Sequence, residues 1–217
     1  MPIIDLPLLR TTLPALALPD AALAHMEHYA AALLETNAHM NLTAITDPRG
    51  VTLKHFADSL SLLTVHDFPQ GARVLDLGTG GGFPGVPLLL ARPDLRVTFL
   101  DGTGKKLRFI AQTLADMGIN AETLHARAED IHKTYRGQFD VVTARAVASL
   151  DKLCGWALPF LAHGGVLLAM KGASAGEEVR EAQPVLRKLH AQVLDCVPVP
   201  LPADCGERWI VRIAMNN

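Results

Sequence analysis

The segment RVLDLGTGGGFPG, residues 73–85, decides the fold of this 217-residue chain. Residues 73–77 predict a short strand, and glycines occupy four of the next five positions. Residues 83–90 predict a helix, since prolines in its first turn lack only amides that would stay unpaired. Glycines allow positive φ and the close approach of a ligand, beside a helix N-terminus that favours electronegative groups. The segment therefore predicts strand, turn and helix next to a small-molecule site.

The glycine turn has two interpretations that differ in ligand. Gly80, Gly82 and Gly85 satisfy G-x-G-x-x-G, the pattern of nicotinamide and flavin sites. Asp76 extends the pattern to Asp-x-Gly-x-Gly-x-Gly, which resembles the first motif of the class I methyltransferases, enzymes that bind S-adenosylmethionine (AdoMet) on a Rossmann-like sheet. A carboxylate there suits the ammonium of an amino acid and would repel a pyrophosphate. AdoMet is the favoured ligand, with a dinucleotide or a ligand-free turn as alternatives.

Composition limits the possible partners. The chain is 49% hydrophobic and 19% charged with a net charge of −2, which suits one α/β domain with an appended segment. No global field draws such a protein onto nucleic acid, so an RNA site must be a local basic patch. Three cysteines without a C-x-x-C pair fit a reducing cytosol and predict no metal site. No apolar run approaches the ~18 residues of a membrane span, so we expect a soluble, cytoplasmic protein.

Residues 1–68 predict a helical lead-in that packs on, or covers, a domain formed by residues 69–217. Asp20 is expected to cap a first helix whose apolar positions recur at helical spacing. Asp47 and Pro48 predict the start of a second helix, with the aspartate as N-cap and the proline at the first helical position.

His55 and Asp58 lie three positions apart on this second helix and therefore share a face. One interpretation is a polar pair aimed at the functional site. The other is a helix-to-helix hydrogen bond that orients the lead-in, and the spacing alone favours this second interpretation.

From residue 72 onward strands and helices alternate, which predicts a Rossmann-like α/β fold. Its sheet should be mostly parallel, with an antiparallel strand at one side formed near the C-terminus. The expected strands are residues 73–77, 96–100, 121–125, 139–143, 166–170, 192–197 and 208–214.

Ligands of such sheets bind at the carboxyl ends of the strands. Asp101 ends the second strand roughly 20 residues past the first glycine, where its two oxygens match the hydroxyls of a ribose. Ala128 and Glu129 follow the third strand, where this fold borders the adenine. For all three residues the alternative is a helix cap. Arg145 ends the fourth strand and is the cation expected to face the cofactor or the substrate.

Two motifs that are missing from the sequence narrow the kind of atom that could accept the methyl group. After the fourth strand the chain reads Thr143-Ala144-Arg145-Ala146, so the Asn/Asp-Pro-Pro-aromatic motif of amino-directed base methyltransferases is missing. Cys154 lies too far into a helix to serve as the nucleophile of a cytosine C5 enzyme. The acceptor should therefore need neither covalent activation nor removal of a proton.

Several motifs between residues 25 and 213 belong together: Asn41-Leu42-Thr43-Ala44-Ile45, His55 with Asp58-Ser59-Leu60, the glycine turn with its Gly-Phe-Pro-Gly ending, Lys105-Lys106, Arg127-Ala128-Glu129, Arg145-Ala146 and Lys171-Gly172. With them the chain resembles the bacterial 16S ribosomal RNA guanine-N7 methyltransferases, also called glucose-inhibited division protein B. One departure is Asp101-Gly102-Thr103-Gly104, which lacks the serine usual in that turn.

The resemblance implies AdoMet contacts at Gly78, Phe83, Ala128, Glu129 and Arg145, and the positions of the other site residues in the sequence suggest their roles. Arg145 is the expected catalytic residue. The expected cofactor contacts, including those from the turn and the strand ends, are Asp76, Gly78, Gly80, Gly82, Phe83, Asp101, Ala128, Glu129 and Arg145. The expected contacts to RNA phosphates are Arg10, Lys105, Lys106, Arg108, Lys171 and Arg208.

The implied reaction is methyl transfer from AdoMet to N7 of a guanine in 16S ribosomal RNA or in the small ribosomal subunit, by a monomer without a metal or a membrane. Guanine N7 carries a free lone pair, so an in-line displacement needs no general base, and His55 and Asp58 become positioning residues. The alternatives are a non-catalytic AdoMet- or RNA-binding module and a nicotinamide oxidoreductase.

Overall fold

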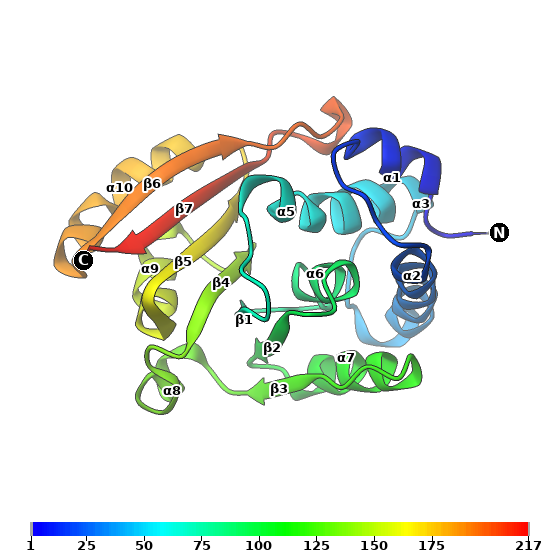
Figure 1. The fold of residues 1–217 in the computed structure, drawn as a ribbon, viewed down its shortest axis with the longest axis horizontal. Coiled ribbons are helices and arrows are strands. Elements are labelled where there is room, and N and C mark those ends of the chain that lie inside the picture. Colours follow the sequence, from blue (N-terminus) through cyan, green and yellow to red (C-terminus); the bar gives the residue numbers. More distant parts are fainter. Residues whose placement is uncertain (1, 217) are drawn as a thin grey trace.

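A computed structural model describes residues 2–216, and within this range the strands form one seven-stranded sheet in the order β3-β2-β1-β4-β5-β7-β6 (Figure 1). All neighbours pair in parallel except β7, which runs antiparallel to both β5 and β6. The mostly parallel sheet with one antiparallel strand is therefore confirmed. The strands are β1 (Arg73–Leu77), β2 (Arg96–Asp101), β3 (Glu122–His125), β4 (Phe139–Arg145), β5 (Leu161–Lys171), β6 (Ala191–Pro198) and β7 (Trp209–Met215).

Helices cover both faces of this sheet because successive strand residues point to opposite sides. Val74 belongs to one hydrophobic core and its neighbour Leu75 to the other. The first core contains residues of α6 (Gly85–Ala91) and α7 (Gly104–Asp116) together with the lead-in. The second contains residues of α8 (Ala128–Tyr135), α9 (Leu150–Ala157), the 3-10 helix η2 (Leu158–Phe160) and α10 (Ala175–Lys188).

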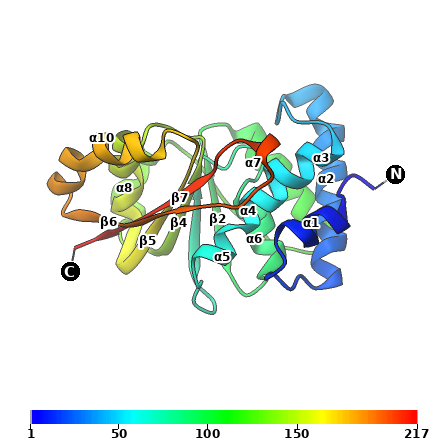
Figure 2. The same ribbon diagram turned by 90° about the horizontal axis from the view of Figure 1, so that it is seen from above.

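The lead-in shares the first core with the rest of the chain. Its helices are α1 (Leu6–Thr12), α2 (Asp20–Met40), α3 (Pro48–Gly50), the wider π-helix η1 (Val51–Ala57), α4 (Asp58–Leu60) and α5 (Leu62–Val65). Fully buried lead-in side chains such as Tyr29 and Phe56 lie in the same cluster as the strand residue Val74. Figure 2 shows α1, α2 and α3 gathered at one end of the molecule and α8 and α10 at the other.

The two expected helix caps of the lead-in have different outcomes. Asp47 caps α3, because its Oδ1 accepts a hydrogen bond from Gly50 N at 2.7 Å. Asp20 as a cap is wrong: it is the first residue inside α2, and the extended residue Pro19 takes the cap position without a side-chain hydrogen bond. A proline holds the extended conformation that a cap needs and moves the acidic side chain into the first turn.

Two elements of the C-terminal half differ from what the sequence predicts, which is a strand that starts at residue 166 and a helix over residues 174–190 that Pro184 disturbs. β5 begins at Leu161, earlier than residue 166, since its first residue pairs with Phe139 of β4 across an irregularity in register. α10 continues through Pro184 without a break. Within residues 2–216 no helix combines the length and the apolar character that crossing a membrane requires.

Candidate active site

The glycine turn joins β1 to α6 at the carboxyl end of the sheet, as the sequence predicts. Gly78, Gly80 and Gly82 adopt φ angles of 70°, 58° and 91°, which side chains rarely allow. Gly78 N donates to Leu100 O at 2.8 Å, so the turn is anchored to the end of the neighbouring strand β2.

Asp76 is the buried residue that holds this turn in place. It is fully buried, and its Oδ2 accepts hydrogen bonds from Thr79 Oγ1 at 2.5 Å and Gly85 N at 2.9 Å. Its Oδ1 accepts from Thr143 Oγ1 of β4 at 3.0 Å. Burial raises the pKa of Asp76, and these donors oppose that rise. The carboxylate thus fixes the start of the turn and of α6, and its direct contact with a ligand stays a prediction.

The other expected cofactor residues lie at the same edge of the sheet. Asp101 ends β2, is partly exposed, and accepts hydrogen bonds from Gly80 N at 3.0 Å and Thr103 N at 2.8 Å. Ala128 and Glu129 begin α8, the first buried and the second exposed. The structure therefore brings the ends of β1, β2 and β3 together as expected, while the individual contacts with AdoMet remain predictions.

A lead-in residue that the sequence did not single out holds the same turn. Tyr29 of α2 is fully buried, and its hydroxyl donates to Gly81 O at 3.0 Å. Phe83 packs against the lead-in as well, with its ring centroid 6.1 Å from that of Tyr29 and 5.5 Å from that of Phe56. The lead-in is thus part of the wall behind the turn. No motif marks Tyr29, because its spacing in the sequence is that of any core residue of an amphipathic helix.

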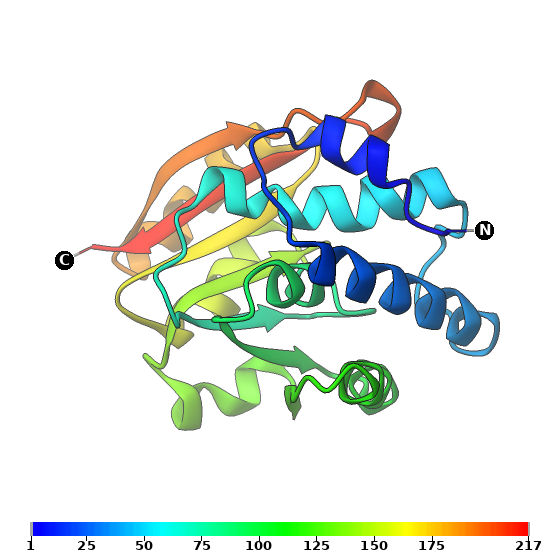
Figure 3. The same cartoon turned by 45° about the vertical axis from the view of Figure 1, so that its right-hand side comes forward.

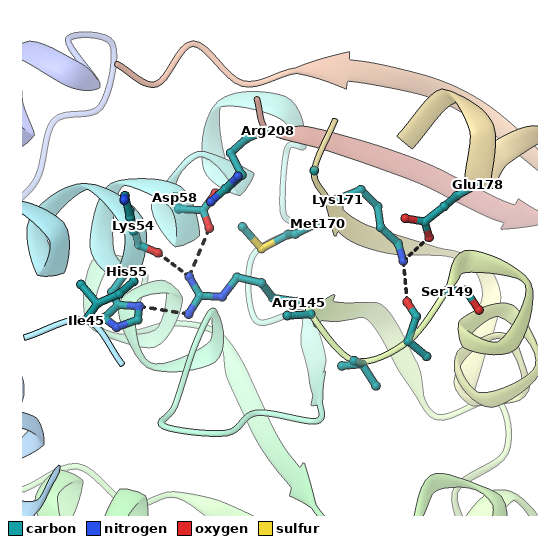
Figure 4. Close-up of a pocket in the computed structure, with 14 residues that line it drawn as sticks. Ile45, Lys54, His55, Asp58, Arg145, Ser149, Met170, Lys171, Glu178 and Arg208 are labelled. Carbon is teal, nitrogen blue, oxygen red and sulfur yellow. Dashed lines mark hydrogen bonds and ion pairs between the residues drawn. The ribbon is translucent and has the colours of Figure 1, made fainter. Parts of the chain in front are cut away.

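Arg145 leaves the end of β4 and reaches into the lead-in (Figure 4). Its Nη1 donates to Lys54 O at 2.7 Å and to Asp58 Oδ2 at 3.1 Å. Its guanidinium carbon lies 5.2 Å from the centre of the Phe83 ring, within the range of a cation–π contact. The hydrogen bond of Asp58 is therefore not helix-to-helix as the alternative expected, because its partner Arg145 ends a strand. This one ion pair ties the lead-in to β4 and lines the cavity described below.

His55 lies beside Arg145 and Phe83, and its imidazole is neutral. Its Nδ1 lies 3.3 Å from Arg145 Nη2 and its Nε2 lies 2.7 Å from Thr43 Oγ1, while its ring stacks on Phe83 at 4.5 Å. An arginine only donates, so Nδ1 is the acceptor and Nε2–H donates to the threonine. Burial and the nearby guanidinium lower the pKa of His55 to about 3. A neutral imidazole with both nitrogens engaged is suited to positioning rather than to accepting a proton.

The lowered pKa of His55 predicts that this residue makes the stability of the fold depend on pH. Unfolded His55 binds a proton below its ordinary pKa of 6.5, whereas folded His55 does so only near a pKa of about 3. Its contribution to the free energy of unfolding is therefore full above pH 6.5 and is lost as the pH falls toward 3, on the order of 3 kcal/mol by pH 4. Urea denaturation of His55→Gln between pH 7 and pH 4 should show a shallower decline than the wild type. The exposed His39→Gln is the control, and a decline equal to that of the wild type in His55→Gln contradicts the prediction.

A cavity of about 770 Å³ opens beside Arg145. It lies over the carboxyl ends of β4 and β5, where the strand order changes direction between β1 and β4. Arg145 is the one expected cofactor residue in its lining, and the glycine turn adjoins it through Val147, which packs against Gly78. Its volume is in the range of small-ligand sites. Figure 4 shows ten of its residues by name, and the full lining is Ile45, Lys54, His55, Asp58, Arg145, Ala146, Val147, Ala148, Ser149, Met170, Lys171, Gly172, Glu178 and Arg208.

The six expected RNA contacts do not form one surface. Lys171 is largely buried, with Nζ donating to Glu178 Oε2 at 2.7 Å and to Ala148 O at 2.6 Å, so it is a wall of the cavity. Arg10 lies on α1 and pairs with Asp20 at 3.5 Å. Figures 1 and 3 place α1 and α7 on opposite sides of α2, which separates Arg10 from the cations of α7.

Lys105, Lys106 and Arg108 lie in the first turns of α7, and Lys105 and Arg108 are exposed. Arg208 lies in the cavity wall. That these cations contact RNA stays a prediction. Within residues 2–216 no group of three histidine, cysteine or acidic side chains is placed to hold a metal ion.

Solved structures share this fold. The chain superimposes on an AdoMet-dependent methyltransferase from Aquifex aeolicus with a TM-score of 0.58 and 18% identity, covering 77% of this chain and 93% of that one. A ribosomal protein L11 methylase from Lactobacillus delbrueckii subsp. bulgaricus gives a TM-score of 0.56 at 17% identity, over 76% of this chain and 79% of that one.

Sequence relatives cover most of the chain. It is 43% identical over 186 residues to "Ribosomal RNA small subunit methyltransferase G" of Lactobacillus delbrueckii subsp. bulgaricus, across 83% of this chain and 78% of the relative. It is 42% identical to the protein of the same name from Halalkalibacterium halodurans, across 91% of this chain and 84% of the relative. A family model described as "rRNA small subunit methyltransferase G" matches residues 22–200. By this match, by these identities and by its fold, the chain belongs to the GidB family of small-subunit rRNA methyltransferases.

Proposed function

We propose that this protein transfers the methyl group of AdoMet to N7 of a guanine in 16S ribosomal RNA. The observation that carries the proposal is the cavity beside Arg145, which lies at the point where the sheet changes direction and reaches the glycine turn through the lining residue Val147. Relatives more than 40% identical are named small-subunit rRNA methyltransferases. The choice of guanine N7 comes from the motifs of the sequence, because N7 carries a free lone pair and its methylation requires no removal of a proton.

The residues present fit AdoMet. The glycine turn offers backbone without side chains, and at Gly80 a Cβ would meet no atom nearer than 3.9 Å, so this position is open to a ligand. At Gly78, Gly82 and Gly85 a Cβ would lie within 3 Å of protein side chains, so packing itself requires glycine there. The turn would hold the amino-acid part, Asp101 the ribose, and Ala128 with Glu129 the adenine. When bound, AdoMet supplies an electrophilic methyl group on a sulfonium.

The reaction requires the protein to align the two reactants and requires no acid–base catalysis. The N7 lone pair forms the new bond to the methyl carbon while the carbon–sulfur bond breaks and its electron pair stays on sulfur. No proton moves, in agreement with a neutral His55 whose nitrogens are engaged by Arg145 and Thr43. Holding the two reactants in line can contribute up to ~7 to 11 kcal/mol. Arg145 and Asp58 form an ion pair in the wall and together bring no net charge to it.

The guanine must be accessible when it reacts. N7 faces the major groove, which in A-form RNA is too narrow for side chains. A looped or flipped base, or RNA met before its helix forms, would enter the cavity from solvent.

The cations of α7 give a prediction about RNA binding. Reversing Lys105 and Lys106 to glutamate should weaken binding to small subunits and flatten its salt dependence, because phosphate contacts release counterions. Affinity for S-adenosylhomocysteine should persist, since neither side chain belongs to the glycine turn. Arg10→Glu on the opposite side of α2 is the comparison variant. Methylation that is unchanged in the Lys105 and Lys106 variant would remove this helix from the RNA surface.

The proposed function is tested by incubating the protein with small ribosomal subunits and AdoMet carrying a labelled methyl group. The expected result is stoichiometric label that maps to a single N7-methylguanine in 16S RNA. Tight S-adenosylhomocysteine and RNA binding without transfer would instead indicate a non-catalytic binding module. Tighter binding of NADH than of S-adenosylhomocysteine would indicate an oxidoreductase.

A further inference from the structure

One buried acceptor atom in the cavity wall has no hydrogen bond. Asp58 is 3% exposed, and its Oδ2 is occupied by Arg145 at 3.1 Å. Its Oδ1 is buried and accepts no hydrogen bond from any residue in the range 2–216. Arg208 Nε lies 3.9 Å from Oδ1, beyond hydrogen-bond distance, and the Arg208 side chain is 31% exposed. Figure 4 shows Asp58 between these two arginines.

An unpaired buried carboxylate oxygen is costly, so its presence calls for a donor that arrives with a ligand. Burial raises the pKa of Asp58, while Arg145 and Arg208 counteract that rise. Asp58 is a lining residue of the cavity that we assign to the acceptor base, and the partly exposed Arg208 is the side chain next to Oδ1, so a donor of that base can reach Oδ1 once Arg208 moves aside.

The other polar groups of the cavity narrow the class of ligand. Glu178, the second carboxylate of the lining, is engaged: Oε2 accepts from Lys171 Nζ and Leu150 N, and Oε1 accepts from Ser174 Oγ. Lysine and arginine only donate. Among the carboxylate oxygens of the lining, Asp58 Oδ1 is thus the one that accepts no hydrogen bond, and Arg145 and Arg208 are the cations beside this carboxylate.

Guanine matches this set of groups better than adenine. Its Watson–Crick edge carries two adjacent donors, N1–H and the N2 amino group, next to the acceptor O6. Adenine presents an acceptor at N1, which a carboxylate would repel. Resting on the function proposed above, we propose that Asp58 Oδ1 selects guanine by accepting a hydrogen bond from the N2 amino group of the target base.

This contact would also favour the reaction. As the N7–carbon bond forms, positive charge spreads over the purine and its N1–H and N2–H groups become stronger donors. A hydrogen bond to a carboxylate then gains more in the transition state than in the ground state, which is the condition for lowering a barrier. No proton is transferred to Asp58 in this scheme.

The test uses small subunits reconstituted on 16S RNA that carries either guanosine or inosine at the mapped position. Inosine lacks only the 2-amino group. Wild-type protein should methylate the guanosine subunits with kcat/KM about 10-fold or more above the inosine subunits, because a hydrogen bond to a charged acceptor is lost. In Asp58→Asn this ratio should fall toward 1, although both rates drop. If that variant does not fold, Asp58→Ser is measured under the same expectation.

Asp204→Asn is the matched control, because it also removes an acidic partner of an arginine, Arg49, at 2.9 Å, but lies outside the cavity lining. It should keep the wild-type ratio. Equal rates of the wild type on guanosine and inosine would overturn the inference, and so would an Asp58→Asn variant that is slower on both by the same factor. Absence of methylation on guanosine subunits would instead contradict the proposed function itself.

Discussion

Arg145→Ala is expected to lower methyl transfer by about 100-fold or more, the scale seen when one positioned donor of an active site is removed. The arginine joins β4 to the lead-in through Lys54 O, His55 and Asp58 and lies over Phe83. Without it, the cavity wall loses the contacts that join β4 to the lead-in and to Phe83 of the glycine turn. Labelled methyl transfer into small subunits, measured together with S-adenosylhomocysteine affinity, checks the effect.

Stability must be measured alongside, because Asp58 would lose its charged partner. Removing one member of a buried ion pair costs about 3 to 5 kcal/mol. Arg145→Lys keeps the charge but lacks the planar fork that reaches several acceptors. Compared with Arg145→Ala, it should therefore restore more of the free energy of unfolding than of the methyl-transfer rate. The control is Arg73→Ala, whose pair with Asp140 at 2.7 Å is substantially exposed and should contribute at most about 1 kcal/mol. A fully active Arg145→Ala enzyme would contradict the assigned role.

Gly82→Ala is expected to abolish binding of S-adenosylhomocysteine in the micromolar range and to destabilise the fold. A Cβ at this position would lie 2.3 Å from Tyr29 Oη and 2.8 Å from Val86 Cγ2, and the φ of 91° disfavours any side chain. Tyr29 is fully buried and cannot move aside without disturbing α2. The turn must therefore shift, and calorimetric titration with S-adenosylhomocysteine measures the consequence.

Two further variants separate the clash from the backbone effect. Gly71 has a φ of 69° and nothing within 4 Å of a built Cβ, so Gly71→Ala should cost only about 1 to 2 kcal/mol and leave ligand binding intact. Combining Gly82→Ala with Tyr29→Phe removes the nearest contact and should restore part of the lost affinity. Wild-type affinity in Gly82→Ala alone would show that the turn tolerates the side chain.

Local sequence rules predicted the elements around the glycine turn well. The strand at residues 73–77, the helix after it and the cap at Asp47 depend on interactions within a few residues, so the sequence carries their signal directly. Asp20 failed as a cap because Pro19 competes for the same position. Arg145 was placed correctly at the end of the fourth strand, yet its partners Lys54 and Asp58 lie 91 and 87 positions away in the chain.

The sequence by itself determined a mostly parallel sheet with a glycine turn at its carboxyl edge, and it placed Asp101, Ala128, Glu129 and Arg145 at the ends of successive strands. Periodicity and turn chemistry suffice for this, because parallel strands carry their ends to one edge. Only the tertiary structure decided that Asp76 turns inward, that Lys171 pairs with Glu178, and that Tyr29 and Asp58 of the lead-in reach the site. Those outcomes depend on which charges and donors meet across distant segments, and burial then decides whether each group finds a partner in the protein or in a ligand.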